Sequence, residues 1–495
     1  MPKEKSIKTN FIMNAILTMS SFIFPMITFP YVSRILLPEG TGKVNFATSF
    51  ISYFTMFAQL GIPTYGIRIC AMIRDDRKEL TRTAHELLII NLIMSCISYI
   101  VLFILLFTLP QLQDDKLLYI IVSANILLTS IGLDWLYKAL EQYTYITIRS
   151  LIFKIIALIA MFLLVHEQKD YVIYGGISIF ASCASHIMNL INAHRYIDWK
   201  PVGNYQLKRH FKSIGIFFAM SCATTIYLHL DTIMLKFMTT DTDVGYYGAA
   251  TKIKTILVSI VTSLGTVLLP RVSYYIQKKQ INAFRNVTKK ALNFVLLLAV
   301  PLTVYFIIFA KQGILFLSGN EYEGAIIPMQ IIMPTLLLIG ITNILGIQIL
   351  VPLKKEKYVL YSEIAGAITD LILNALLIPR FKSAGAAIGT VAAEFVVLIV
   401  QYSVLRKEVG SAFRSIRYIK ILISIICGVS ASFWVKYLSL NSFLLLLISS
   451  CSFFIVYGLT LVILKEQLVI DIANQISMKI LKKHLFKISD GNHEQ

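Results

Sequence analysis

The sequence predicts an all-α, polytopic membrane protein of about 14 transmembrane helices. Apolar stretches of about 20 residues follow one another from Phe11 to Leu464, and a helix of that length crosses a hydrocarbon core about 30 Å thick. Only 15% of the 495 residues are charged, against about 25% in a typical soluble chain. The polar breaks between the stretches are short, so no soluble catalytic domain fits between them.

Each expected span begins and ends where an apolar stretch does. The tail 466–495 places Leu468, Ile472 and Ile476 at helical spacing among lysines. This pattern indicates an amphipathic helix on the cytoplasmic leaflet, with a frayed polar tail as the alternative. The expected spans are 11–33, 44–66, 86–109, 117–137, 150–165, 171–193, 213–238, 244–268, 291–310, 326–350, 359–378, 385–405, 419–438 and 442–464.

The positive charge is unevenly distributed, which decides what it means. The chain carries a net charge of +19, and most of its 46 Lys and Arg residues fall in alternate polar segments, for example Arg68–Arg82 and Lys138–Lys154. The other segments are poor in basic residues and tend to be acidic, as at Asp241–Asp243. This alternation is the positive-inside pattern, so it predicts a membrane protein with both termini in the cytoplasm. It argues against nucleic-acid binding.

Signatures of enzymes, metals and cofactors are missing from the sequence. The six cysteines lie scattered in apolar stretches without metal-type spacing, so buried packing is their expected role. No Gly-rich phosphate loop followed by Lys and Ser or Thr occurs, and no nucleophile elbow occurs. We therefore expect no metal, no cofactor and no enzymatic activity.

A weak internal repeat indicates the domain organisation. Segment 42–48 (GKVNFAT) is similar to 245–251 (GYYGAAT), and 163–165 (LLV) with Lys169 is similar to 376–378 (LLI) with Lys382. Both offsets are close to six spans, so two copies would share one orientation in the membrane. The expected domains are two six-helix lobes at 1–200 and 201–410, two additional spans at 411–465, and the tail at 466–495.

Cations within the spans are candidates for anion binding. An ionisable side chain inside a bilayer costs at least about 2.5–3.5 kcal/mol, so each one requires a partner or a function. Lys252 and Lys254 lie within the eighth span and suggest a cationic wall. Arg34 and Lys236 lie near the outer ends of spans one and seven. Snorkelling to the interface remains the alternative for this second pair, and a structural ion pair with Asp231 remains the alternative for Lys252.

Acidic and amide side chains within the spans are candidates for coupling or gating. Asp231, near the lysine pair, suggests a salt-bridge gate. Glu363, Asp370 and Asn374 share one helical face of span eleven, and Glu394 on span twelve is expected to face the same lumen. A polar face there binds a coupling ion or sugar hydroxyls, or only joins helices by hydrogen bonds. A lone histidine such as His229 is more often a hydrogen-bonded packing residue.

Several segments resemble the polysaccharide transporter family, the bacterial oligosaccharide repeat-unit flippases within the multidrug, oligosaccharidyl-lipid and polysaccharide exporter superfamily. The resemblance covers nearly the whole chain. Leu37 departs from it, because the family often has Gly before the following turn. The segments that carry it are 29–42 (FPYVSRILLPEGTG), 59–63 (QLGIP), 133–137 (LDWLY), 145–149 (YITIR) and the stretches 230–271 and 378–394.

The resemblance implies a function. It implies that undecaprenyl-diphosphate-linked oligosaccharide moves from the inner to the outer leaflet by alternating access, for capsule, O-antigen or related polysaccharide (lipopolysaccharide) assembly. Cationic residues in the cavity of related flippases hold the diphosphate. By position Lys252 is the best match, followed by Arg34, Arg68, Lys236 and Lys254. Expected partners are membrane lipids, Na⁺ or H⁺ as coupling ion, and polymerase and glycosyltransferase neighbours.

Two other functions remain open from the residues alone. A cation-coupled multidrug antiporter of the same superfamily would need a site lined by acids and aromatics, whereas this chain places Lys252 and Lys254 in the expected cavity. A membrane-embedded polysaccharide polymerase would need a large outer loop with catalytic residues, and the outer loops here are short.

Overall fold

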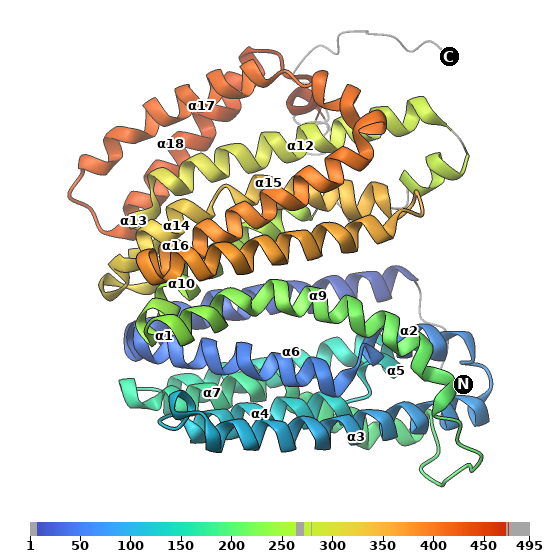
Figure 1. Ribbon diagram of the computed structural model, residues 1–495. Helices are drawn as coiled ribbons and strands as arrows, with labels where there is room; N and C mark the ends of the chain where they lie inside the picture. Colours follow the sequence, from blue (N-terminus) through green and yellow to red (C-terminus); the bar gives the residue numbers. More distant parts are fainter. Residues whose placement is uncertain (1–6, 264–271, 279, 472–473, 475–495) are drawn as a thin grey trace. The chain divides into compact units, whose positions relative to one another are not determined.

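The protein is built of helices, many of them as long as a bilayer is thick (Figure 1). The computed structural model describes residues 7–263, 272–278, 280–471 and 474, and these residues contain no β-strand. Within them, nine helices are long and apolar enough to cross a membrane, or ten when a bent pair is taken as one span. The predicted class, a polytopic all-α membrane protein, is confirmed.

Two of the helices are too long to be single spans. Helix α1 (Ile7–Gln59) has 53 residues and α16 (Glu356–Arg414) has 59, which corresponds to about 80 to 90 Å of helix. Each contains a residue with a positive φ, Leu37 at 58° and Lys382 at 50°. Each is therefore two helices joined at a turn. When α1 and α16 are each divided at their turn, and α4 (Lys116–Ile131) and α10 (Asp241–Thr262) are added, the described helices fall on the predicted apolar stretches. The count of fourteen spans stays a prediction.

Side-chain contacts demonstrate the turn in α16. Asn374 and Thr390 would be about 24 Å apart along a straight helix, yet both bond the carboxylate of Asp231. Lys382 lies midway between them. An added Cβ at Gly385 would lie 2.6 Å from the carbonyl oxygen of Leu377, as expected where two helix arms meet. Helix α16 thus folds back on itself at Lys382 (Figure 1).

Two compact units make up the chain. The first comprises Met1–Ala250, Leu317–Pro328 and Glu363–Thr390, and the second comprises Thr251–Phe316, Met329–Ser362 and Val391–Gln495. The predicted lobes at 1–200 and 201–410 and the additional spans at 411–465 stay predictions. Most of the predicted tail 466–495 lies outside the described residues.

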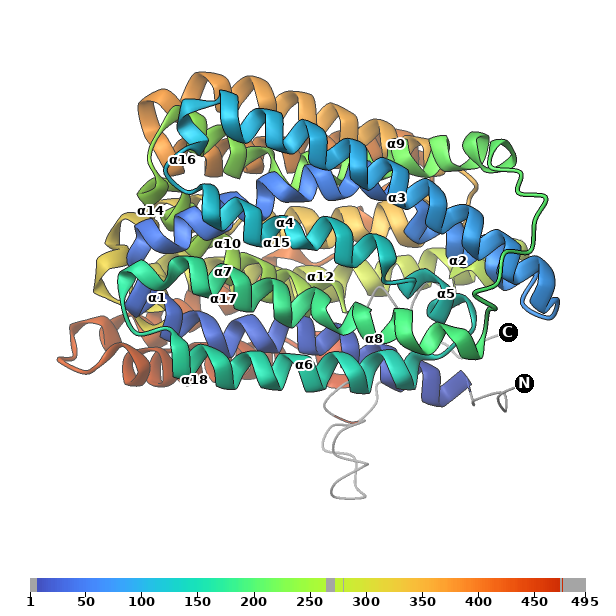
Figure 2. The ribbon, with the colours of Figure 1, turned by 90° about the horizontal axis from the view of Figure 1, so that it is seen from below.

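Helix α1 is the central helix of the first unit. It packs against α3, α4, α6 and α9, and Figure 2 shows α6 running beside it. The remaining helices of this unit are α2 (Ile62–Met72), α3 (Arg77–Thr108), α4 (Lys116–Ile131), α5 (Asp134–Ala139), α6 (Tyr143–Leu164), α7 (Tyr171–Ile179), the π-helix η3 (Phe180–Ala184), α8 (Ser185–Asn192), α9 (Lys208–Met238) and the beginning of α10 (Asp241–Thr262).

A buried ion network fixes the beginning of α9. Glu86 of α3 is fully buried, and its carboxylate accepts bonds from Arg209 Nη2 and His210 Nε2, both at 2.7 Å. The other ring nitrogen of His210 contacts the Tyr65 hydroxyl of α2 at 2.8 Å. A buried charge is tolerated only when it is paired in this way, so the network ties α9 to α2 and α3.

The repeat motifs pack against each other. A Cβ added at Gly42 would collide with the carbonyl group of Asp241, and a Cβ added at Gly245 would collide with that of Pro38. Gly245 follows Gly42 by 203 positions, and Asp241 follows Pro38 by the same number. The two contacts are therefore equivalent under the repeat offset. Glycine is needed at both positions because the two backbones meet there.

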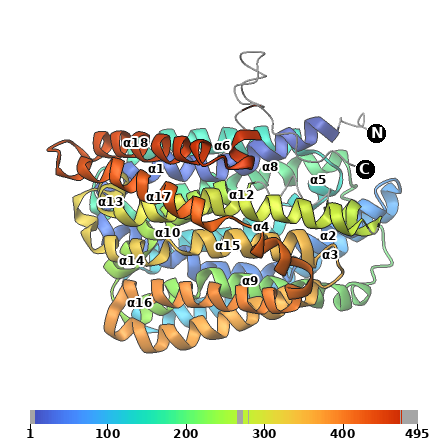
Figure 3. The same ribbon diagram turned by 90° about the horizontal axis from the view of Figure 1, so that it is seen from above.

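The second unit contains the C-terminal helical pair. Helices α17 (Tyr418–Phe433) and α18 (Ser442–Ile463) lie side by side, as Figure 3 shows. A core of Tyr305, Phe309 and Phe453 joins α18 to α12. The end of α13 and the beginning of α14 belong to the first unit. The other helices are α12 (Ile281–Ile308), α13 (Ala310–Ser318), α14 (Ile326–Ile332), α15 (Thr335–Asn343) and the π-helix η6 (Ile344–Leu350).

We predict that Gly42→Ala and Gly245→Ala each destabilise the protein by about 1–3 kcal/mol, because the methyl group meets backbone that cannot rotate away. The midpoint of thermal unfolding in detergent is the measurement. Gly215→Ala in α9 is the matched control, since its added Cβ meets nothing within 4 Å. The control should be neutral or stabilising by up to about 1 kcal/mol. Equal behaviour of all three variants would contradict the close contact.

Candidate functional site

A buried carboxylate is the centre of the candidate site. Asp231 lies in the last third of α9, and its side chain is shielded from solvent. One oxygen accepts a bond from Asn374 Nδ2 at 2.6 Å, and the other accepts from the Thr390 hydroxyl at 2.9 Å. The Tyr247 hydroxyl of α10 also bonds this second oxygen. A single carboxylate thus joins α9, α10 and both arms of α16.

The partners of Asp231 are short of protons. The Tyr247 and Thr390 hydroxyls contact each other at 2.9 Å, and Thr390 also contacts the carbonyl oxygen of Ala386 at 3.0 Å. Together with their bonds to Asp231, the two hydroxyls make four contacts but own only two protons. If Asp231 is ionised, some of these four oxygen–oxygen contacts therefore have no hydrogen atom between the two oxygens. A proton on Asp231, or a small cation among these oxygens, reduces the deficit.

Further oxygen atoms surround the same place. The side-chain oxygen of Asn374 is buried and lacks a hydrogen-bond donor among the described residues. A Cβ added at Gly389 would collide with this oxygen and would lie 2.9 Å from Asp370 Oδ1. Gly389 thus leaves the space in which the Asp370 and Asn374 side chains lie against the second arm of α16. Carboxylate, amide and hydroxyl oxygens of this kind are suitable ligands for small hard cations and can also accept a proton.

The structure brings together some of the residues that were predicted to act in coupling or gating. Asp231, Asp370 and Asn374 lie in the first unit near one another, as the predicted polar face of span eleven requires. Glu363 lies two turns before Asp370 on the same arm of α16 and is half-buried. Glu394 is buried one turn after Thr390, in the part of α16 that belongs to the second unit.

The predicted anion-binding cations lie in different settings. The Lys236 ammonium is bound to the carboxylate of Asp241 at 2.6 Å, and Arg34 donates to the carbonyl oxygens of Pro30 and Leu317. Arg68 is exposed on α2, whereas Lys252 and Lys254 are half-buried on α10 in the second unit. Their roles in substrate binding stay predictions.

Sequence reasoning missed the uncharged members of the site. Tyr247 lies inside the repeat motif 245–251, and Thr390 follows Gly389, but neither residue type is unusual in a membrane helix. His229, predicted to be a packing residue, contacts the Ser49 hydroxyl at 3.2 Å. Only the shared contact with Asp231 identifies Tyr247 and Thr390.

One basic segment of the sequence overlaps an expected span. The segment Lys138–Lys154 ends within the expected span 150–165, and helix α6 contains both Arg149 and Lys154. Arg149 is buried and donates to the carbonyl oxygen of Ser185 at 2.7 Å. Lys154 contacts two serine hydroxyls of α1. Both cations therefore lie within a helix that is long and apolar enough to cross a membrane.

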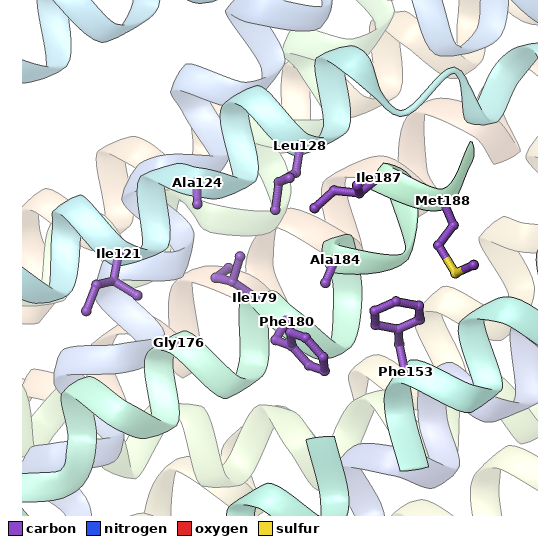
Figure 4. Close-up of a pocket in the computed structure, with 10 residues that line it drawn as sticks. All are labelled: Ile121, Ala124, Leu128, Phe153, Gly176, Ile179, Phe180, Ala184, Ile187 and Met188. Atoms are coloured by element: carbon purple, nitrogen blue, oxygen red, sulfur yellow. The ribbon is translucent and has the colours of Figure 1, made fainter. Parts of the chain in front are cut away.

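An apolar cavity lies elsewhere in the first unit. It measures about 400 Å³ and is bounded by α4, α6 and the helices that follow α6, as Figure 4 shows. Its lining offers no charged side chain, so it suits hydrocarbon rather than phosphate or sugar. The lining residues are Ile121, Ala124, Leu128, Phe153, Gly176, Ile179, Phe180, Ala184, Ile187 and Met188.

Comparison with known proteins identifies the family. The sequence model of the family described as "Polysaccharide biosynthesis protein" matches residues 7–276, and that of the MatE family matches residues 217–376. Two proteins named "Putative O-antigen transporter" are each 24% identical: that of Escherichia coli over 79% of this chain and 95% of its own length, and that of Shigella dysenteriae over 79% and 98%.

A solved structure shares the fold. The lipid II flippase MurJ in its inward closed conformation superposes with a TM-score of 0.59 at 16% identity, and the match covers 93% of both chains. Both relatives named above are transporters, which agrees with the expectation that the chain is not an enzyme. The family model covers more than half of the sequence, and the resemblance noted in the sequence is confirmed. The chain is a multi-pass membrane protein that belongs to the polysaccharide biosynthesis protein family.

Proposed function

We propose that the protein is a flippase that moves undecaprenyl-diphosphate-linked oligosaccharide repeat units from the cytoplasmic to the outer leaflet by alternating access. The match to relatives named as O-antigen transporters, over about four fifths of this chain, is the observation that carries the proposal. The shared fold with a lipid II flippase supports it. The proposed location is the bacterial cell membrane, with both termini in the cytoplasm. Polymerase and glycosyltransferase partners would act on either side of this step.

We propose that the Asp231 site couples transport to a small cation, Na⁺ or H⁺. The cluster lacks protons for its own contacts, and it connects α9, α10 and both arms of α16. Binding of a cation would satisfy the oxygens and hold these helices together, and its release would weaken their connection. A change at one carboxylate would thus alter the packing of four helical segments. No nucleotide-binding motif offers another source of energy.

The MatE match over residues 217–376 favours one second candidate, a cation-coupled multidrug antiporter. Such a protein would also use a buried carboxylate, but its substrate would be an organic cation. Two assays distinguish the two candidates. Proteoliposomes with the flippase should make lipid-linked oligosaccharide accessible to an added glycosidase. Cells with the antiporter should instead survive higher concentrations of cationic drugs.

We predict that Lys252→Ala traps lipid-linked repeat units in the inner leaflet. The cationic side chain is proposed to hold the diphosphate, and its loss removes charge-assisted hydrogen bonds. Glycosidase accessibility in spheroplasts measures the outer-leaflet fraction, which should fall at least tenfold. Lys252→Arg keeps the charge and should retain most transport. Normal surface polysaccharide in the Ala variant would remove Lys252 from the site.

We predict that Asp231→Asn abolishes the dependence of transport on a cation gradient and lowers the rate at least tenfold. The amide cannot be ionised and so cannot hold a proton or Na⁺ by charge. Flipping is measured in proteoliposomes with a Na⁺ gradient, a pH gradient, or neither. Asp75→Asn, an exposed residue before α3, is the control and should transport like the wild type. A mutant that keeps the gradient dependence would contradict the coupling role.

We predict that Gly389→Ala weakens cation binding, because its methyl group displaces the Asn374 and Asp370 oxygens. The shift of the thermal unfolding midpoint on adding NaCl, compared with KCl, or on acidification reports binding. Gly410→Ala, further along α16, meets only one atom, at 3.9 Å, and is the matched control. If Gly389→Ala retained the full cation-dependent shift, the cation would have to bind elsewhere.

A further inference from the structure

A lysine lies at mid-depth in the first unit. Helix α6 runs from Tyr143 to Leu164, and Lys154 lies about 15–16 Å from either end. Its ammonium group is therefore near the middle of a membrane span. A charged group at that depth is rare and generally marks a functional site or an internal partner.

The partners of Lys154 are hydroxyl groups instead of acids. Its Nζ contacts Ser20 Oγ at 2.8 Å and Ser21 Oγ at 3.1 Å on α1. Both serine hydroxyls can donate to the carbonyl oxygen of Leu17, so their lone pairs accept from the ammonium. No carboxylate pairs with Lys154 within the part of the chain that the structure describes.

Three other helical lysines of the unit are paired with acids. Lys43 lies 3.6 Å from Asp115, Lys138 lies 2.7 Å from Asp134, and Lys236 lies 2.6 Å from Asp241. Each of them has its charge offset by a neighbouring acid. In contrast, the charge of Lys154 is solvated by hydroxyls alone, and one of the three ammonium protons has no acceptor among the described residues.

The face of α1 toward Lys154 is polar. Asn14, Thr18 and Ser21 follow one another at steps of four and three, so they lie on one side of the helix. All three are exposed. The Thr18 and Ser21 hydroxyls donate to the carbonyl oxygens of Asn14 and Leu17 in their own helix, which satisfies them within a membrane span. Lys154 reaches the edge of this row at Ser21.

We propose that Lys154, Ser20 and Ser21 form a further binding site for the diphosphate of the lipid-linked substrate, besides the one proposed at Lys252, and this proposal rests on the flippase function. The ammonium supplies the positive charge, and its remaining proton points to an anion. On binding, the serine hydroxyls turn from the backbone carbonyl to the phosphate oxygens. Three donors then converge on one anionic group, which an acid-paired lysine cannot provide.

The test is binding of farnesyl diphosphate to the purified full-length protein in phosphatidylcholine nanodiscs, by titration calorimetry. Lys154→Gln should raise the dissociation constant at least tenfold, since it removes a charge-assisted bond. Lys154→Arg should stay within about threefold of the wild type, because the charge remains. The control Lys169→Gln, an exposed residue before α7, should bind like the wild type.

Further variants and lipids separate the possible outcomes. Ser20→Ala with Ser21→Ala keeps the lysine and should weaken binding severalfold, which tests the site if Lys154→Gln does not fold. Unchanged binding by Lys154→Gln overturns the site while the flippase function stands. A wild type that neither binds farnesyl diphosphate nor flips lipid-linked oligosaccharide overturns the function itself. If phosphatidylglycerol in the nanodiscs abolishes binding, the site serves bulk phospholipid headgroups, and the diphosphate assignment is wrong.

Discussion

The cost of an unsatisfied polar group in hydrocarbon governs this structure. No water inside a bilayer can replace a missing hydrogen bond, so each polar side chain within a span must find a partner in the protein or line a wet space. Asp231 meets this requirement through three donors from three helices. The same requirement fixes the close pairing of the two arms of α16, because Asn374 and Thr390 reach one carboxylate only if the helix turns back at Lys382.

The proposed coupling rests on the same constraint. A site whose contacts outnumber its protons would have two states, one with an added cation and one without. The hydrogen bonds among α9, α10 and α16 would differ between these states, so occupancy of the site would change how the helices pack. Membrane helices are suited to such a switch because their association depends on packing and on a few polar bonds.

The sequence predicted the features that depend on composition and periodicity. Within the described residues the predicted apolar stretches fall on helices, and Asn374 on the predicted polar face bonds Asp231, because hydropathy and helical spacing act locally. Tyr247 and Thr390 escaped notice because hydroxyl groups are common in membrane helices and their role depends on a distant partner. Leu37 is an instructive case: the turn in α1 uses a positive φ where the family often has glycine. Lys154 lies within the expected span 150–165, but its serine partners on α1 could not be predicted because they depend on tertiary packing.

Two charged groups within helices of the first unit, Asp231 and Lys154, have opposite surroundings. Around Asp231 oxygen acceptors exceed protons, which calls for a cation, whereas around Lys154 the partners are hydroxyls, which leaves the positive charge for an anion. We propose a cycle in which the diphosphate leaves the cytoplasmic side and the cation enters from the outside. An interior-negative membrane potential favours both movements, by about 2.3 kcal/mol per charge per 100 mV. In this cycle the outward movement of the substrate and the return of the carrier with its cation would each be favoured, so that transport would have a direction without a nucleotide site.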